Sequence, residues 1–267
     1  MICKYGCYYA ADGIKLRCIE FRHKDDRMTY YEVVKKAQAA ERTGFGTVQF
    51  APCETWLAGD QINLWTYWQG YQLKDIDQKG VDILLVGQDW GNPNRNPEVI
   101  RRIERIQSGS EQVSYLATAS PTDKTMIEMF KVFGDGIDIT KASPRLRLFF
   151  TNYSLGYRTG SETGGMAKRV MRQDTELFND LVLAIKPKII ICLGKITFEM
   201  VTGTIANGFV KRLREGAPFK TAFPLDSRIP VYSVAHCGSR GKSNVGGEEN
   251  MRKAWERIAE ESRNLFR

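Results

Sequence analysis

Residues 81–89 read Val81-Asp82-Ile83-Leu84-Leu85-Val86-Gly87-Gln88-Asp89, a nearly continuous apolar run that ends in a short polar turn. Such a run is typical of a strand that is covered on both faces of a parallel sheet. Three further apolar runs lie at 146–151, 188–193 and 229–234, with helix-like segments between them. This alternation predicts an α/β fold with three layers, α/β/α, around a central four-stranded parallel sheet with right-handed crossovers.

The helices are predicted from amphipathic spacing, over residues 97–107, 123–133, 167–185, 196–201 and 248–265. The first 75 residues differ, because they contain four of the six cysteines, a predicted strand at 14–21 and a predicted helix over 30–42. Thr29 and Glu32 have the spacing of a capping box at the start of that helix. We therefore expect a cysteine-containing N-terminal extension over residues 1–75, able to pack on the core, and an α/β core over residues 76–267.

The composition bounds the class of protein. Of the 267 residues, 39 are Lys or Arg and 31 are Asp or Glu, which gives a formal net charge of +8. An excess of this sign favours a polyanionic partner such as nucleic acid, although a basic surface that only keeps the protein soluble is the alternative. We find no apolar run of bilayer-spanning length and no signal-peptide pattern at the N-terminus, so we expect a cytoplasmic monomer with no membrane partner.

Polar residues follow three of the predicted strands. Asp89 comes after the first, Asn152 after the second, and His236, one of only two histidines, after the last. Since open α/β sheets bind ligands at the carboxyl ends of their strands, these side chains predict a catalytic pocket. Taken singly, Asp89 has the alternative of a turn aspartate that binds backbone amides, and Asn152 that of a capping residue.

The order of these features resembles the uracil-DNA glycosylase superfamily over about residues 80–260. The matching features are Gly-Gln-Asp after a strand, Ser-Pro-Thr before a helix, and later strands that end in Asn, in Leu-Gly and in His. The resemblance implies a hydrolase for base excision repair, a DNA glycosylase that removes a flipped base, most readily uracil, without a catalytic cofactor. The residues that it implies are catalytic Asp89 and His236; base-binding Gly87, Gln88, Asn152 and Tyr115; and DNA-binding Ser120, Pro121, Thr122, Ser239 and Arg240.

The chain departs from the pattern of this superfamily at two places. Trp90-Gly91 stands where classical members have Pro-Tyr, whose tyrosine excludes thymine, and Arg240 stands where they have a leucine that wedges into the base stack. Two other functions therefore stay open. One is a nucleic-acid or nucleotide-binding protein that keeps the fold without the chemistry, and the other is a hydrolase of small nucleosides.

The N-terminal cysteines form a separate motif. Cys3, Cys7, Cys18 and either His23 or Cys53 supply the ligand types of a structural zinc site, although their spacing fits no standard zinc finger. The alternative is a set of free, partly buried thiols. The sequence predicts no cofactor for catalysis and leaves a structural zinc open.

Overall fold

The computed structural model describes residues 28–41, 43, 50–51, 76–89, 121–134, 146–154, 157–158 and 168–267. Its central sheet has five strands in the order β3-β2-β5-β7-β6. Their bounds are β2 (Ile83–Gly87), β3 (Leu148–Asn152), β5 (Ile189–Leu193), β6 (Lys220–Phe223) and β7 (Asp226–Val234). The first four strands in the spatial order pair in parallel, and β6 pairs antiparallel with β7. The predicted α/β class is thus confirmed, with a fifth, antiparallel strand that the sequence analysis did not predict.

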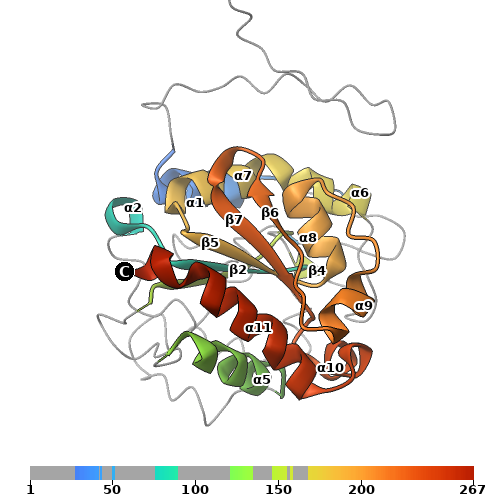
Figure 1. Ribbon diagram of the computed structural model, residues 1–267. Coiled ribbons are helices and arrows are strands. Elements are labelled where there is room, and N and C mark those ends of the chain that lie inside the picture. Colours follow the sequence, from blue (N-terminus) through green and yellow to red (C-terminus); the bar gives the residue numbers. More distant parts are fainter. Residues whose placement is uncertain are drawn as a thin grey trace, which may run out of the picture.

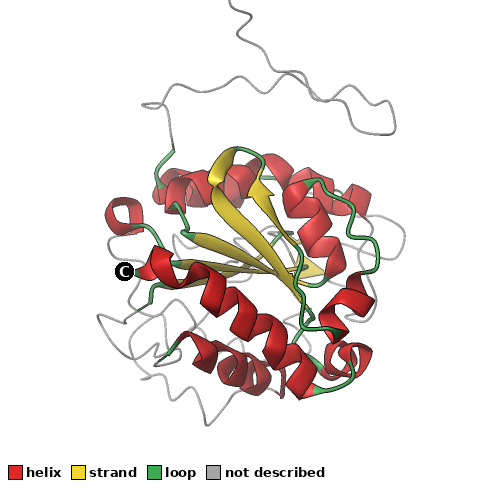
Figure 2. Cartoon of the chain, viewed as in Figure 1, coloured by secondary structure: helices red, strands yellow, loops and turns green. Residues whose placement is uncertain are grey.

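Helices cover both faces of this sheet (Figures 1 and 2). One face carries α5 (Pro121–Phe130), α10 (Ser239–Val245) and α11 (Glu248–Ser262). The other carries α1 (Tyr30–Ala39), α7 (Thr175–Ile185) and α8 (Lys195–Thr202). The remaining elements are short: β1 (Phe50–Ala51), α2 (Ile76–Lys79), η4 (Lys131–Phe133), β4 (Tyr157–Arg158), α6 (Lys168–Met171), η5 (Arg172–Asp174), α9 (Phe209–Arg214) and η6 (Arg263–Phe266).

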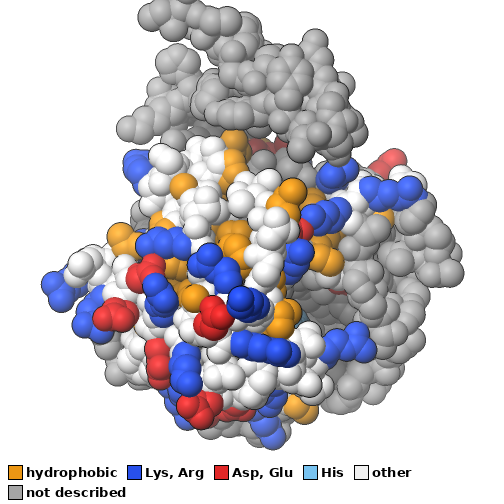
Figure 3. Space-filling view, turned by 45° about the vertical axis from the view of Figure 1, so that its right-hand side comes forward, with side chains coloured by type: hydrophobic (Ala, Val, Ile, Leu, Met, Phe, Trp, Pro, Cys, Tyr) orange, Lys and Arg blue, Asp and Glu red, His pale blue; other side chains and the backbone are white. Residues whose placement is uncertain are grey.

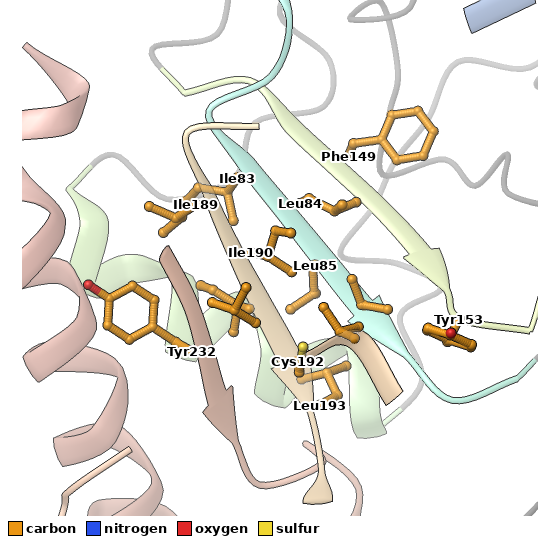
Figure 4. Packing of buried hydrophobic residues seen from close by; sticks show 14 of the residues in the cluster. Ile83, Leu84, Leu85, Phe149, Tyr153, Ile189, Ile190, Cys192, Leu193 and Tyr232 are labelled. Carbon is orange, nitrogen blue, oxygen red and sulfur yellow. The ribbon is translucent and has the colours of Figure 1, made fainter. Parts of the chain in front are cut away.

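The sheet is the centre of the hydrophobic core. Every residue of β2 and of β5 is buried, as two-sided coverage requires. Figure 4 shows apolar side chains of β2, β3, β5 and β7 meeting between the strands and the helices. The continuous apolar runs in the sequence therefore mark these strands because both of their faces leave water.

The apolar runs in the sequence did not predict the edge strand β6 or the first residues of β7. Strand β6 is partly exposed and β7 starts at Asp226, three residues before the predicted strand. A strand whose faces are partly exposed needs no continuous apolar run, whereas β3, at the opposite edge, is almost wholly buried and has one. Pro230 lies in β7 opposite Ala222 of β6, and the pairing of β7 with β5 starts only at Val231. The missing N–H of proline therefore costs no bond to β5.

The structure differs from the predicted helices at two places. The segment predicted as one helix over 167–185 consists of α6, the 3₁₀ turn η5 and α7. The region after His236, where no helix was predicted, contains α10. The predicted strand at 14–21 and helix at 97–107 lie outside the described residues.

Helix α1 belongs to the core, although it falls within the predicted N-terminal extension. The capping box is present, because the Thr29 side chain accepts from the Glu32 N–H and the Glu32 side chain accepts from the Thr29 N–H. Val33, Val34 and Ala37 are buried in the main hydrophobic cluster. Lys36 bridges Glu176 and Asp180 on α7, at 2.6 Å from each. The predicted boundary near residue 75 is not tested by these contacts.

We expect Ile191→Ala to lower the free energy of unfolding by about 2–5 kcal/mol, because it removes three carbons from the fully buried centre of β5. Ile205→Ala is the matched control, since Ile205 is 65% exposed, and it should change stability by no more than about 0.5 kcal/mol. Urea unfolding of the two variants measures both values. Equal midpoints would contradict the assignment of β5 to the core.

Candidate active site at the carboxyl edge of the sheet

Three of the parallel strands, β3, β2 and β7, end at the same edge of the sheet, with β5 between β2 and β7. β2 ends at Gly87, β3 at Asn152 and β7 at Val234, so the loops with Asp89 and His236 leave from the same edge as Asn152. The neighbouring strands β2 and β5 are followed by α5 and α8, which lie on opposite faces. Such a change of face opens a crevice beyond the strand ends, which is where open α/β folds bind ligands.

Gly87 and Asn152 approach each other more closely than any side chain at position 87 would allow. The two residues are paired in the β2–β3 ladder. A Cβ on Gly87 would lie 2.0 Å from Oδ1 of Asn152 and 3.2 Å from its Cγ. Glycine at position 87 thus provides the space that the Asn152 amide occupies.

Asn152 is only 5% exposed. Among the described residues, its side-chain amide has no hydrogen-bond partner. The amide is not completely shielded from solvent. A buried amide normally finds partners for both its donor and its acceptor. An amide that stays available in this way can read the edge of a ligand that offers both an acceptor and a donor.

Asp89 lies in the loop after β2, partly buried, with its neighbour Gln88 turned toward it. Nε2 of Gln88 donates to Oδ1 of Asp89 at 2.8 Å. This bond restricts the rotation of the carboxylate and so fixes its orientation at the edge of the sheet.

Two further backbone hydrogen bonds hold the segments that follow β2 and β3 together, beyond the end of the strand pairing. The backbone N–H of Tyr153 donates to the carbonyl of Gly87 at 2.9 Å, and that of Ser154 to the carbonyl of Gln88 at 3.0 Å. The hydroxyl of Ser154 in turn donates to Oδ2 of Asp174 at 2.9 Å. Asp174 is 3% exposed and ends η5, just before α7. The sequence analysis missed this carboxylate because it falls inside a segment that reads as one continuous helix.

His236 is fixed in one neutral tautomer by its own loop. The backbone N–H of Gly238 donates to Nδ1 of His236 at 3.0 Å. A nitrogen that accepts a hydrogen bond carries no proton, so the ring proton is on Nε2. The imidazole therefore presents Nε2–H as a neutral donor.

The electrostatic surroundings of His236 favour this neutral form. The residue keeps exposed surface, yet the partial removal of its ring from water lowers its pKa below the usual 6.5. The carboxylate of Asp89 acts on the same ring in the opposite sense and is the weaker influence. Asp89 and His236, which are 147 positions apart in the sequence, therefore lie near enough in the fold to interact electrostatically.

Gly238 lies between the histidine and the first turn of α5. A Cβ on Gly238 would lie 3.0 Å from Nδ1 of His236 and 3.3 Å from Oγ1 of Thr122. Thr122 and Pro121, both predicted to contact DNA, thus begin a helix that reaches the loop of His236. The structure brings these residues together with the histidine.

The other predicted site residues divide into two groups. Ser239 and Arg240 form the exposed first turn of α10, three and four residues after His236. Tyr115, Ser120, Trp90-Gly91 and the proposed zinc ligands Cys3, Cys7, Cys18, His23 and Cys53 lie outside the described residues.

Within the described ranges, no group of three or more His, Cys, Asp or Glu side chains is placed to hold a metal ion. Cys192 and Cys237 are buried and form no disulfide, and burial raises the pKa of Cys192 well above its usual value. None of the described helices combines the length and apolar character that a membrane span requires.

No model of a known protein family matches the chain, and it has no significant match among curated proteins.

Gly87→Ala should displace the Asn152 amide and lower the free energy of unfolding by about 1–3 kcal/mol, because the new methyl group overlaps Oδ1. In an Asn152→Ala background the overlap is gone, so the same change should cost much less. Denaturant unfolding of the two single variants and the double variant tests this coupling. Additive costs would mean that the two side-chain positions do not compete for space.

We expect His236 to titrate below its usual pKa of 6.5, and Asp89→Asn to lower that pKa further, because it removes the nearby negative charge. ¹⁵N-detected NMR measures this directly. A His23→Gln background leaves one histidine, since the chain has two. The nitrogen shifts should show the proton on Nε2. A pKa above 6.5, or a proton on Nδ1, would contradict the arrangement.

Proposed function

We propose that this protein is a DNA glycosylase that hydrolyses the N-glycosidic bond of a flipped base, with uracil as the first candidate. The observation that carries the proposal is the hydrogen bond from the Gly238 N–H to Nδ1 of His236. It leaves Nε2–H as a neutral donor, close enough to Asp89 to interact electrostatically with it. His236 and Asp89 both lie in loops at the carboxyl edge of the sheet. The buried amide of Asn152 lies at the same edge and has no hydrogen-bond partner among the described residues. A donor, a carboxylate and a base-reading amide are the parts that this reaction needs.

His236 fits the task of stabilising the leaving base. As the bond from C1′ to the base nitrogen breaks, its electron pair moves onto the base, and negative charge develops on the carbonyl oxygen next to that nitrogen. A fixed N–H donor stabilises such charge where it forms. A neutral donor serves here, because Nε2 needs only to share its proton and not to lose it.

Asp89 fits the task of balancing the sugar. The sugar gains positive charge at C1′ while the base leaves, and an adjacent carboxylate stabilises that charge. The same carboxylate can orient the water that supplies hydroxide to C1′, and the proton from that water neutralises the released base. The bond from Gln88 keeps one oxygen of Asp89 in a fixed direction during these steps.

Asn152 fits the task of recognising the base. Its amide offers one donor and one acceptor, which matches the N3–H and O4 edge of uracil. The base in a duplex must leave the stack to reach such a group, so the proposal includes base flipping. Exclusion of thymine is not assigned, because Trp90-Gly91 lies outside the described residues.

The test is a base-release assay on single-stranded and duplex oligonucleotides that contain one uracil. Asp89→Asn should lower the turnover by about 10²–10⁴-fold and leave DNA binding nearly intact, because the amide keeps the shape and loses the charge. Glu249→Gln is the control, since it makes the same chemical change on an exposed turn of α11 and should leave turnover unchanged.

Three results would overturn the proposal. A wild-type protein that binds uracil-containing DNA and releases no base is a binding protein. Cleavage of free deoxyuridine without cleavage of DNA identifies a small-nucleoside hydrolase. Full activity of Asp89→Asn would remove the carboxylate from the mechanism.

A further inference from the structure

Helices α9 and α10 form a basic surface beside the loop of His236. The two helices pack against each other, and α10 starts three residues after His236. Their exposed cations are Lys211, Arg212, Arg214 and Arg240. Figure 3 shows this side of the molecule, on which Lys and Arg side chains outnumber the acidic ones. We call these four residues the α9–α10 surface.

None of these four cations forms an ion pair among the described residues. The guanidinium of Arg212 lies 4.5 Å from the centre of the Phe219 ring, and Nε of Arg214 donates to the carbonyl of Asn244 at 2.8 Å. Both contacts hold a guanidinium in place without neutralising its charge. The two arginines are thus already ordered, which reduces the entropy lost when a ligand binds.

Two acidic groups at the start of α11 are paired with lysines. Glu248 lies 3.5 Å from Lys242, and Glu249 lies 3.3 Å from Lys253. Glu215, directly after α9, is exposed and opposes the cations. Glu256 and Glu260 of α11 line the same hollow as Glu215, so four positive groups stand against three carboxylates, and a smaller positive excess remains.

We infer that the α9–α10 surface binds the phosphate backbone of the DNA strand that carries the flipped nucleotide. This inference rests on the proposed function for the position of the strand. Phosphate contacts fix the register of a nucleic acid without reading its sequence, and each contact releases condensed counterions. Arg240 lies four residues after His236, and α9 packs against the helix that carries Arg240, so the surface adjoins the loop of His236 and can hold the strand while its base enters the site.

A protein partner is the competing occupant of this surface. Ile205, in the loop before α9, is 65% exposed, and Val210 on α9 is 38% exposed. Exposed apolar side chains beside arginines are typical of protein interfaces. The cations favour DNA, because in the described part of the chain four of them form no ion pair and two large apolar side chains are exposed on this surface.

The test compares Lys211→Ala/Arg240→Ala with Arg263→Ala/Arg267→Ala. Each pair removes two exposed positive charges, and the second pair lies at the far end of α11, on the side of the C-terminus in Figure 1. Among the described residues, the side chains of Lys211 and Arg240 form no hydrogen bond, ion pair or ring contact that the substitutions would remove. Binding is measured on fluorescent, uracil-free DNA, single-stranded and duplex, between about 50 and 200 mM salt.

The first pair should reduce the slope of log affinity against log salt by about 1.4 for single strands to about 1.8 for duplex, since each lost contact contributes about 0.7 or 0.9. The control pair should leave the slope within about 0.5 of the wild-type value. Equal slopes for all three proteins, or an equal reduction in both pairs, would overturn the inference and assign the surface to a protein partner.

Uracil release by the wild-type protein separates this inference from the proposed function. Release with unchanged slopes in Lys211→Ala/Arg240→Ala leaves the glycosylase proposal standing and overturns the surface. A reduced slope in that variant, with no uracil released by the wild type, supports the surface and overturns the glycosylase. Absence of DNA binding by the wild type overturns both.

Discussion

The parallel pairing of β2 with β3 on one side and with β5 on the other is the constraint on which the rest of the structure depends. Parallel pairing brings the carboxyl ends of the strands to one edge, and the register places Gly87 directly opposite Asn152. A shift by one residue would turn every side chain of β2 to the other face and separate Asn152 from the glycine that makes room for it. The core and the candidate site are therefore specified by the same ladder.

Buried polar contacts then convert a strand edge into a fixed arrangement of side chains. Asp174 is buried and accepts from Ser154, whose N–H in turn holds the carbonyl of Gln88. A buried carboxylate without such partners would be costly, so this network tolerates few alternative loop positions. Rigidity of this kind suits a site whose groups must already be in place when charge develops.

The sequence predicted those features whose physical cause is local. The apolar runs that became β2, β3, β5 and most of β7 are visible because both faces of these strands are buried, and the capping box of Thr29 is visible because its spacing is fixed. The edge strand β6 escaped because its partly exposed faces leave no continuous apolar run. The break at η5 and the short helix α10 escaped as well. For the site, the strand-end positions of Asp89, Asn152 and His236 were predictable. The close approach at Gly87, the buried Asp174 and the bond from Gly238 to His236 were not, because each depends on the backbone path of a loop.

The basic surface and the neutral histidine complement each other. A bound polyanion adds negative potential near the site, and negative potential favours the protonated form of an imidazole. Protonation of His236 at Nδ1 would, however, replace the acceptor of the Gly238 N–H with a second donor and break that bond. The Gly238 N–H thus opposes the shift that the ligand itself would cause. Under the proposed function, the cations of α9 and α10 would hold the DNA strand, while the Gly238 N–H would keep the imidazole of His236 uncharged.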